Sequence, residues 1–216
     1  MKACIFDLDG TLTDTIVSLT FSVQSTLKEM HLPEITMEQC QSFVGNGARR
    51  LMEDTLKAVG DDELERIDEA MEVYGRIFDE NCTYHVTPYE GVMELLKELK
   101  ERGIKTAVLS NKPHRQTVKV VREVLGEELI DWAQGQQESI RRTPDPDGVY
   151  AVMKQLGVTK EECLYVGDSE VDAQTGKNAG VKTVCVTWGF RTKEQLKDAG
   201  AGCLIDAPAE LLEYIL

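Results

Sequence analysis

The stretch Phe6–Asp14 reads FDLDGTLTD and directly follows the apolar run Ala3–Ile5. The apolar run is typical of a buried strand, and it ends on two aspartates, Asp7 and Asp9. On an extended chain, side chains two residues apart point to the same side, so these carboxylates share a direction. Bare carboxylates repel each other and resist burial. The pair therefore predicts a cation between the carboxylates or, as an alternative that the pair alone leaves open, an ordinary turn role for Asp9.

The length and charge of the chain limit the classes of protein to consider. Its 216 residues suit one large domain, or one domain with a sizeable insertion. The formal net charge is −14, from 38 acidic and 24 basic residues, which argues against nucleic-acid and anionic-membrane partners. No apolar run approaches the roughly 20 residues that span a bilayer, and the first strand begins too early for a signal peptide. We therefore expect a soluble cytoplasmic protein.

Six cysteines are spread along the chain, and three of them lie inside apolar, strand-like runs. They are Cys4, Cys40, Cys82, Cys163, Cys185 and Cys203. No two are close in sequence, which is typical of free, buried thiols in a reducing compartment rather than of disulfides or a zinc site. This distribution agrees with a cytoplasmic location.

Short apolar runs rich in β-forming residues recur along the chain. Most are continuous rather than alternating, which is typical of strands buried on both faces of a parallel sheet. The predicted strands are Ala3–Phe6, Thr106–Leu109, Leu129–Ala133, Cys163–Val166, Thr183–Thr187 and Cys203–Ile205. Helical patterns lie between the later strands, at Tyr89–Arg102, Gln116–Leu125, Gly148–Leu156 and Asp172–Ala179. This alternation predicts an α/β fold with a doubly wound, Rossmann-like parallel sheet.

Residues 15–86 interrupt this alternation because they hold no clear strand. Instead, a helical stripe runs from Ile16 to Met30, a capping-box sequence starts at Thr36, and two more helical patterns cover Ala48–Val59 and Glu63–Phe78. The simplest organisation is a small all-helical cap domain at residues 15–86. It would be inserted after the first strand of an α/β core domain formed by residues 1–14 and 87–216.

Polar side chains follow two further predicted strands. Ser110, Asn111 and Lys112 come after the strand that ends at residue 109, and Asp168 and Asp172 come after the strand that ends at residue 166. Ligands of such sheets bind beyond the carboxyl ends of the strands, so these groups and the first two aspartates are expected to meet there. Carboxylates from two strand ends call for a hard divalent cation, and Mg²⁺ is the usual one. The serine, taken alone, is equally consistent with helix capping.

Together these motifs resemble three of the four motifs of the haloacid dehalogenase-like phosphohydrolases: Asp7–Leu12 followed by Asp14, Ser110–Lys112, and Gly167–Asp172. The resemblance extends over nearly the whole chain. The helical insertion resembles the cap that one branch of the superfamily carries after its first strand. Val44–Gly47 and Thr187–Phe190 are most similar to the phosphoglycolate phosphatase branch. The resemblance implies a phosphatase that acts on a small phosphorylated metabolite, with 2-phosphoglycolate as the candidate substrate.

The resemblance also implies a role for each matching aspartate. Asp7 would be the nucleophile that forms an aspartyl-phosphate. Asp9 would be the general acid for the leaving group and then the base for the hydrolytic water. The carboxylates of Asp7 and Asp168 and the backbone carbonyl of Asp9 would bind Mg²⁺. Asp172 would support the metal site from nearby.

The sequence departs from the family at one position of its phosphate-binding motifs. Ser110 and the amide of Asn111 would bind phosphate oxygens, but Thr143 stands where the fourth family motif has a lysine before a proline. Such a charged group contributes about 3–4 kcal/mol of transition-state stabilisation. Because a residue before proline tends to be extended, Arg141 would share a face with Thr143 and reach the phosphate. Lys112 is the other candidate, and a weakened enzyme is the third interpretation.

The sequence therefore predicts a Mg²⁺-dependent phosphatase that is assisted by Arg141 or Lys112. A pyrophosphatase or sugar-phosphate mutase on the same core is one alternative. A regulatory or binding protein on a catalytically weakened core is another. The segment Gly45–Gly47, followed by Arg49 and Arg50, is a weaker candidate for binding a substrate carboxylate. The oligomeric state is left open.

Overall fold

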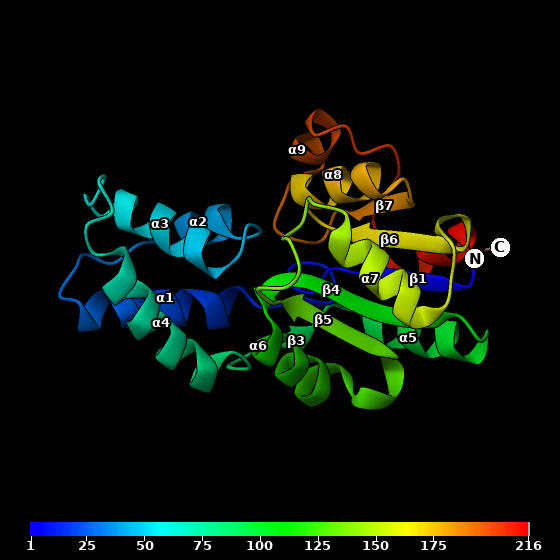
Figure 1. The fold of residues 1–216 in the computed structure, drawn as a ribbon, viewed down its shortest axis with the longest axis horizontal. Coiled ribbons are helices and arrows are strands. Elements are labelled where there is room, and N and C mark those ends of the chain that lie inside the picture. The colour runs from blue at the N-terminus through cyan, green and yellow to red at the C-terminus, as the bar shows by residue number, and fades with distance from the viewer. Residues whose placement is uncertain (216) are drawn as a thin grey trace.

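The computed structural model describes residues 1–215, and its largest element is a six-stranded sheet (Figure 1). The strand order is β5-β4-β1-β6-β7-β8, and every neighbouring pair is parallel. The strands are β1 Ala3–Phe6, β4 Lys105–Pro113, β5 Trp132–Gln136, β6 Cys163–Gly167, β7 Lys182–Val186 and β8 Leu204–Ile205. The prediction of an α/β fold with a parallel sheet is confirmed.

Helices cover both faces of this sheet. They are α5 Val92–Glu101, α6 His114–Val120, α7 Asp147–Leu156, α8 Glu170–Ala179 and α9 Lys193–Asp198. Along β1, Ala3 and Ile5 belong to the apolar cluster that contains the buried side chains of α7. Cys4 and Phe6 belong to a second cluster, which contains those of α5. Because alternate side chains point to opposite faces and both faces are covered, the strand sequences are continuously apolar.

Four further helices form a separate group beside the sheet, on the left of Figure 1. They are α1 Ile16–Glu29, α2 Met37–Phe43, α3 Ala48–Ala58 and α4 Ile67–Asn81. The predicted capping box is present at the start of α2, where the Gln39 N–H donates to Thr36 Oγ1 at 3.2 Å and the Thr36 N–H donates to Gln39 Oε1 at 2.9 Å. The helical character of this segment agrees with the prediction. The domain boundaries at residues 14/15 and 86/87 stay a prediction.

A short antiparallel ribbon lies where the chain passes between the two groups. In this ribbon β2 (Thr13–Asp14) pairs with β3 (Thr87–Pro88). The sequence pattern predicted neither strand, because two residues are too few to show an alternation. The ribbon holds the two crossings of the chain side by side.

Several predicted boundaries were wrong. The strand expected to end at Leu109 continues to Pro113, so Ser110, Asn111 and Lys112 lie within β4 rather than after it. Local turns account for two other differences. The strand expected at Leu129–Ala133 begins later, because Glu127–Leu129 forms a 3₁₀ turn. The helix expected at Glu63–Phe78 begins at Ile67, because Leu64 has a φ of 57° and interrupts the helical pattern. Local turns thus displaced both element ends without changing the order of elements.

The state of the cysteines and the length of the helices can be compared with the expectations from the sequence. All six cysteines are free thiols, as predicted; five are buried and Cys203 is half-buried. Among residues 1–215, none of the helices combines the length and the apolar composition that crossing a membrane requires.

Candidate active site

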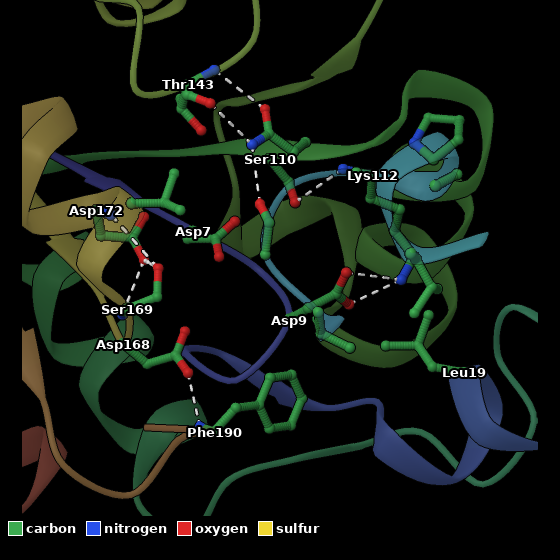
Figure 2. A pocket seen from close by; sticks show the side chains of 18 of the residues that line it. Asp7, Asp9, Leu19, Ser110, Lys112, Thr143, Asp168, Ser169, Asp172 and Phe190 are labelled. Carbon is green, nitrogen blue, oxygen red and sulfur yellow. Dashed lines mark hydrogen bonds and ion pairs between the residues drawn. The ribbon is translucent and has the colours of Figure 1, made fainter. Parts of the chain in front are cut away.

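The strand-end motifs meet because β1 lies between β4 and β6 in the sheet. Asp7 follows β1, Ser110 and Lys112 lie in the last part of β4, and Asp168 follows β6. All four residues line one cavity, and Figure 2 shows their side chains around it. Residues of α3 and α4 in the helical group complete its lining. The convergence expected at the carboxyl end of the sheet is therefore present.

Three aspartates form an acidic cluster on one side of this cavity. One carboxylate oxygen from each of Asp7, Asp168 and Asp172 lies within 4.8 Å of the others. Asp168 and Asp172 are each 2% exposed. Gly10 has a φ of +87°, and a Cβ at this position would collide with the Asp168 carboxylate. The turn after β1 needs a glycine in order to close around this carboxylate.

Hydrogen bonds orient two of these carboxylates. The backbone N–H of Phe190 donates to Oδ2 of Asp168 at 2.7 Å. The hydroxyls of Ser169 and Tyr165 donate to Asp172 at 2.6 and 3.0 Å. Ser169 also caps the N-terminus of α8, so the start of this helix holds Asp172 in place. The contact from Phe190 was missed, because a backbone donor from a distant loop leaves no sequence signal.

The cluster strongly disfavours negative charge when no cation is present. Burial raises the pKa of Asp7 well above its ordinary value, and the carboxylates of Asp172, Asp168 and Asp9 raise it further. The pKa of Asp168 is raised to about 7, first by burial and then by the Asp172 carboxylate. Burial also raises the pKa of Asp172, although hydrogen bonds from Ser169 and Tyr165 oppose this shift. A cation bound among these groups would favour their ionised forms.

The donor set fits a hard divalent cation. All three groups are carboxylates, which are ligands that Mg²⁺ prefers, and the absence of a Cβ at Gly10 leaves the Asp168 carboxylate its place in the cluster. Asp172 belongs to the cluster together with Asp7 and Asp168, where the sequence analysis expected a supporting position. The carboxylate of Asp9 faces a different partner. Its metal contact through the backbone carbonyl stays a prediction.

Lys112 and Asp9 form a buried ion pair on the other side of the cavity from the acidic cluster (Figure 2). The Lys112 Nζ atom lies 2.7 and 2.9 Å from the two carboxylate oxygens of Asp9. The side chains are 2% and 11% exposed. Nζ also lies 4.9 Å from the centre of the Phe78 ring of α4, as a cation–π contact. The helical group therefore shields this ammonium group from bulk water.

Thr143 lines the cavity, where the family motif has its lysine, and is 8% exposed. Its N–H donates to Oδ1 of Asn111 at 3.1 Å. In return, Nδ2 of Asn111 donates to the carbonyls of Thr143 and Gly45 at 3.1 and 2.9 Å. The Asn111 side chain thus ties together β4, the loop at residue 143 and the helical group. The side-chain amide is therefore engaged within the protein, and a contact of Asn111 with phosphate stays a prediction.

Arg141 lies outside the cavity, which corrects the expectation that it reaches the phosphate. Its side chain is 71% exposed and forms ion pairs with Asp145 and Asp147 at 2.8 and 2.7 Å. These carboxylates lie in the same loop and hold the guanidinium group at the surface. Of the two cations considered from the sequence, the structure brings only Lys112 to the cavity.

Arg49 and Arg50 also lie outside this cavity. Their side chains are 49% and 51% exposed and pair with Glu53 and Asp54 of the same helix at 3.3 and 2.8 Å. The neighbouring segment contributes its backbone instead, since Gly47 lines the cavity at the start of α3. The expectation that Arg49 or Arg50 binds a substrate carboxylate in this cavity is corrected. Carboxylates four residues further along the helix hold both side chains at its surface.

Arg191 is a buried residue that the sequence analysis missed. It is 9% exposed, and its Nε donates to Glu170 Oε2 at 2.8 Å. Its Nη2 donates to the carbonyl of Val44 in the helical group, also at 2.8 Å. Arg191 therefore connects the loop after β7 to the segment that covers the cavity. The resemblance noted at Thr187–Phe190 marks this loop but indicates no such contact.

Comparison with known proteins identifies the family. The model of the haloacid dehalogenase-like hydrolase family matches residues 4–186. The phosphoglycolate phosphatase of Pseudomonas savastanoi pv. phaseolicola (strain 1448A / Race 6) is 33% identical over 216 residues, which cover 98% of this chain and 78% of that protein. The phosphoglycolate phosphatase of Aquifex aeolicus (strain VF5) is 32% identical over 199 residues, which cover 92% of this chain and 91% of that protein.

A solved structure agrees with these relatives. A candidate phosphoglycolate phosphatase from Lactobacillus delbrueckii subsp. bulgaricus ATCC BAA-365 matches with a TM-score of 0.90 at 31% identity, and the match covers 100% of this chain and 98% of that one. The family match spans most of the chain, and each of these relatives exceeds 30% identity. The chain therefore belongs to the haloacid dehalogenase-like hydrolases, and within them it is phosphoglycolate phosphatase-like.

Proposed function

We propose that this protein is a Mg²⁺-dependent phosphatase that hydrolyses a small phosphorylated metabolite through an aspartyl-phosphate on Asp7. The observation that carries the proposal is a single cavity in which a cluster of carboxylates faces a buried lysine. Phosphoryl transfer depends on positioning and on charge neutralisation, and this arrangement supports both. The family and its phosphoglycolate phosphatases indicate the same reaction class, hydrolysis of phosphoric monoesters.

The reaction uses two aspartates in sequence. The Asp7 carboxylate attacks phosphorus and forms a P–O bond while the ester P–O bond breaks, and protonated Asp9 gives its proton to the leaving alkoxide. Asp9 then takes a proton from a water molecule, whose oxygen attacks the phosphorus of the aspartyl-phosphate. Inorganic phosphate leaves and Asp7 is regenerated. A bound phosphate would compete with Asp9 for Lys112, which releases the Asp9 carboxyl group for these proton transfers.

Positive charge at the phosphate has two proposed sources. Mg²⁺, held by Asp7, Asp168 and Asp172, would neutralise phosphate charge as the nucleophile approaches. Lys112 supplies the second charge, where Thr143 offers only a hydroxyl group. Ser110 lines the same cavity, and its hydroxyl would donate to a phosphate oxygen. Since the carboxylates and a buried cation are all present, the arrangement favours an active enzyme over a weakened regulatory protein.

The size of the cavity favours a small substrate. Its volume is about 50 Å³. That volume is on the order of a few water-sized groups. We infer 2-phosphoglycolate as the substrate, because it is small and because the relatives named above carry that activity in their names. A sugar phosphate would require the helical group to move away from the sheet, and pyrophosphate is the rival of similar size.

The direct test is phosphate release from a panel that contains 2-phosphoglycolate, an aryl phosphate, inorganic pyrophosphate and a hexose phosphate. We expect the highest kcat/KM for 2-phosphoglycolate in excess Mg²⁺, and a loss of all turnover when EDTA removes the metal. A preference for pyrophosphate, or isomerisation of the hexose phosphate without phosphate release, would favour the rival enzymes. A protein that binds Mg²⁺ yet hydrolyses no member of the panel would support the regulatory alternative.

The effect of Mg²⁺ on thermal stability is expected to increase with pH. The pKa of Asp168 is about 7 in the folded protein, above its ordinary value of 3.8. Between these values the folded state keeps a proton that the unfolded state releases, so this group makes the metal-free protein progressively less stable as pH rises. Above about pH 7 Asp168 is ionised in the folded protein too, so the repulsion among the clustered carboxylates is complete. A bound cation relieves this repulsion.

Calorimetry can measure this effect as the rise in Tm that excess Mg²⁺ causes at about pH 8 and at about pH 5.5. A ligand at 100 times its Kd adds about 2.7 kcal/mol of stability, so the rise at the higher pH is expected to be several degrees. It should be smaller at the lower pH, because protons compete with the metal for Asp168. An equal rise at both pH values would contradict metal binding by this cluster.

A further inference from the structure

Tyr74 has no role in the reaction described above, although it lines the same cavity. It lies on α4 and is 2% exposed. Its ring stacks on that of Phe78, one helical turn later, with centroids 5.1 Å apart. Both rings line the cavity from the helical group, and together with the start of α3 they are called the helical cover.

The hydroxyl of Tyr74 has no hydrogen-bond partner in the part of the protein that the structure describes. None of the side-chain hydrogen bonds of residues 1–215 involves it, and no hydrogen bond affects its pKa. Burial and the nearby charge of Asp9 raise that pKa well above its ordinary value, so the group stays a neutral O–H donor. Buried tyrosine hydroxyls usually have a hydrogen-bond partner. At a cavity wall, the missing partner is expected to come from the cavity.

The N-terminus of α3 lies at the same cavity. Gly47, the N-cap residue, has a φ of +83° and provides no side-chain cap, and both Gly47 and Ala48 line the cavity. The first N–H groups of this 11-residue helix are therefore left for another acceptor. Helix N-termini favour negatively charged groups through these donors and the helix dipole. The cover thus combines a neutral O–H donor with a positive helix end.

We propose that the Tyr74 hydroxyl and the N-terminal N–H groups of α3 bind a carboxylate at the end of the substrate opposite the phosphate, which makes Tyr74 a specificity-determining residue. This inference rests on the proposed phosphatase function. The phosphate is held at the sheet by Ser110 and Lys112, so a short substrate presents its other end to the helical cover. A carboxylate is an acceptor for both kinds of donor, whereas a methyl group leaves them unpaired.

The test compares two substrates of matched size, 2-phosphoglycolate and ethyl phosphate, in Tyr74→Phe and wild-type protein. Hydrogen bonds to charged groups contribute about 1.5–3 kcal/mol, so kcat/KM for 2-phosphoglycolate is expected to fall about 10- to 100-fold. The value for ethyl phosphate should change less than about twofold, because this substrate has no carboxylate. Tyr84→Phe is the matched control, since Tyr84 is 42% exposed and lies outside the cavity.

Three kinetic results would overturn the inference. An equal fall for both substrates would indicate that Tyr74 only supports the shape of the cavity. An unchanged preference for 2-phosphoglycolate in Tyr74→Phe would show that the hydroxyl makes no contact with the carboxylate. If wild-type protein hydrolyses ethyl phosphate as well as it hydrolyses 2-phosphoglycolate, the phosphatase proposal stands and this inference fails.

A binding measurement keeps the inference testable even if no turnover is found. The Asp7→Asn protein is titrated with 2-phosphoglycolate in a calorimeter, with and without Tyr74→Phe. We expect affinity to fall by about 10-fold or more when the hydroxyl is removed. Equal affinities of the two proteins would overturn the inference, independently of catalysis.

Discussion

Asp7→Asn is expected to lower phosphate release by about four orders of magnitude or more, because an amide cannot form the aspartyl-phosphate. The change keeps the shape of the side chain while it removes the attacking oxygen anion. Remaining turnover would reflect only water attack on a bound ester. The measurement is kcat for an aryl phosphate and for 2-phosphoglycolate in excess Mg²⁺.

The same variant provides its own test of folding. Burial and neighbouring carboxylates raise the pKa of Asp7, so removing its charge relieves repulsion. We expect the metal-free variant to unfold at the same temperature as the wild type or higher, and to gain less stability from Mg²⁺. Asp198→Asn is the control, because Asp198 is exposed and is not among the residues that line the cavity. Activity within about tenfold of wild type in Asp7→Asn would contradict nucleophilic catalysis by Asp7.

Lys112→Met is expected to lower kcat/KM by about 10²- to 10³-fold, which is the loss seen when one preorganised charge-stabilising group is removed. Lys112 is the buried cation beside Asp9, and methionine can still pack against Phe78. The physical reason is electrostatic, since phosphate charge that builds up in the transition state would lose its partner on this side of the cavity. Kinetics with 2-phosphoglycolate measure the loss, and circular dichroism checks the fold.

Two further variants distinguish Lys112 from the other candidate sources of positive charge at the phosphate. Adding Thr143→Lys to Lys112→Met is expected to restore part of the rate, because residue 143 lines the same cavity. Arg141→Ala should leave the rate unchanged, since its guanidinium group is paired at the surface. Full activity of Lys112→Met, or a large loss in Arg141→Ala, would mean that the cation comes from elsewhere.

Local sequence patterns were sufficient to predict the fold class. Continuous apolar runs predicted strands buried on both faces, and apolar residues that recur with the 3.6-residue period of a helix predicted the helices between them. The bounds of β1 agree with the prediction, since its apolar run ends sharply at Asp7. The weaker run at Leu129–Ala133 was placed too early, because a turn there has no distinct periodicity.

Local sequence patterns could not predict which basic residue provides the cation of the cavity. Lys112 and Arg141 were both compatible with the sequence, and neither position has a local signal that favours one over the other. The choice depends on Asp9, which is 103 residues from Lys112 in the chain and reaches it because β1 and β4 are adjacent. It also depends on α4, whose Phe78 covers the ammonium group.

The sequence by itself determined the α/β fold, the helical insertion and the strand-end carboxylates, because periodicity and motif order are properties of neighbouring residues. Only the tertiary structure decided that Lys112 is paired with Asp9, that Arg141 is held outside and that Tyr74 covers the cavity with an unpaired hydroxyl. These contacts join elements from distant parts of the chain. Their geometry follows from strand order and from the position of α3 and α4 at the cavity, which no local pattern specifies.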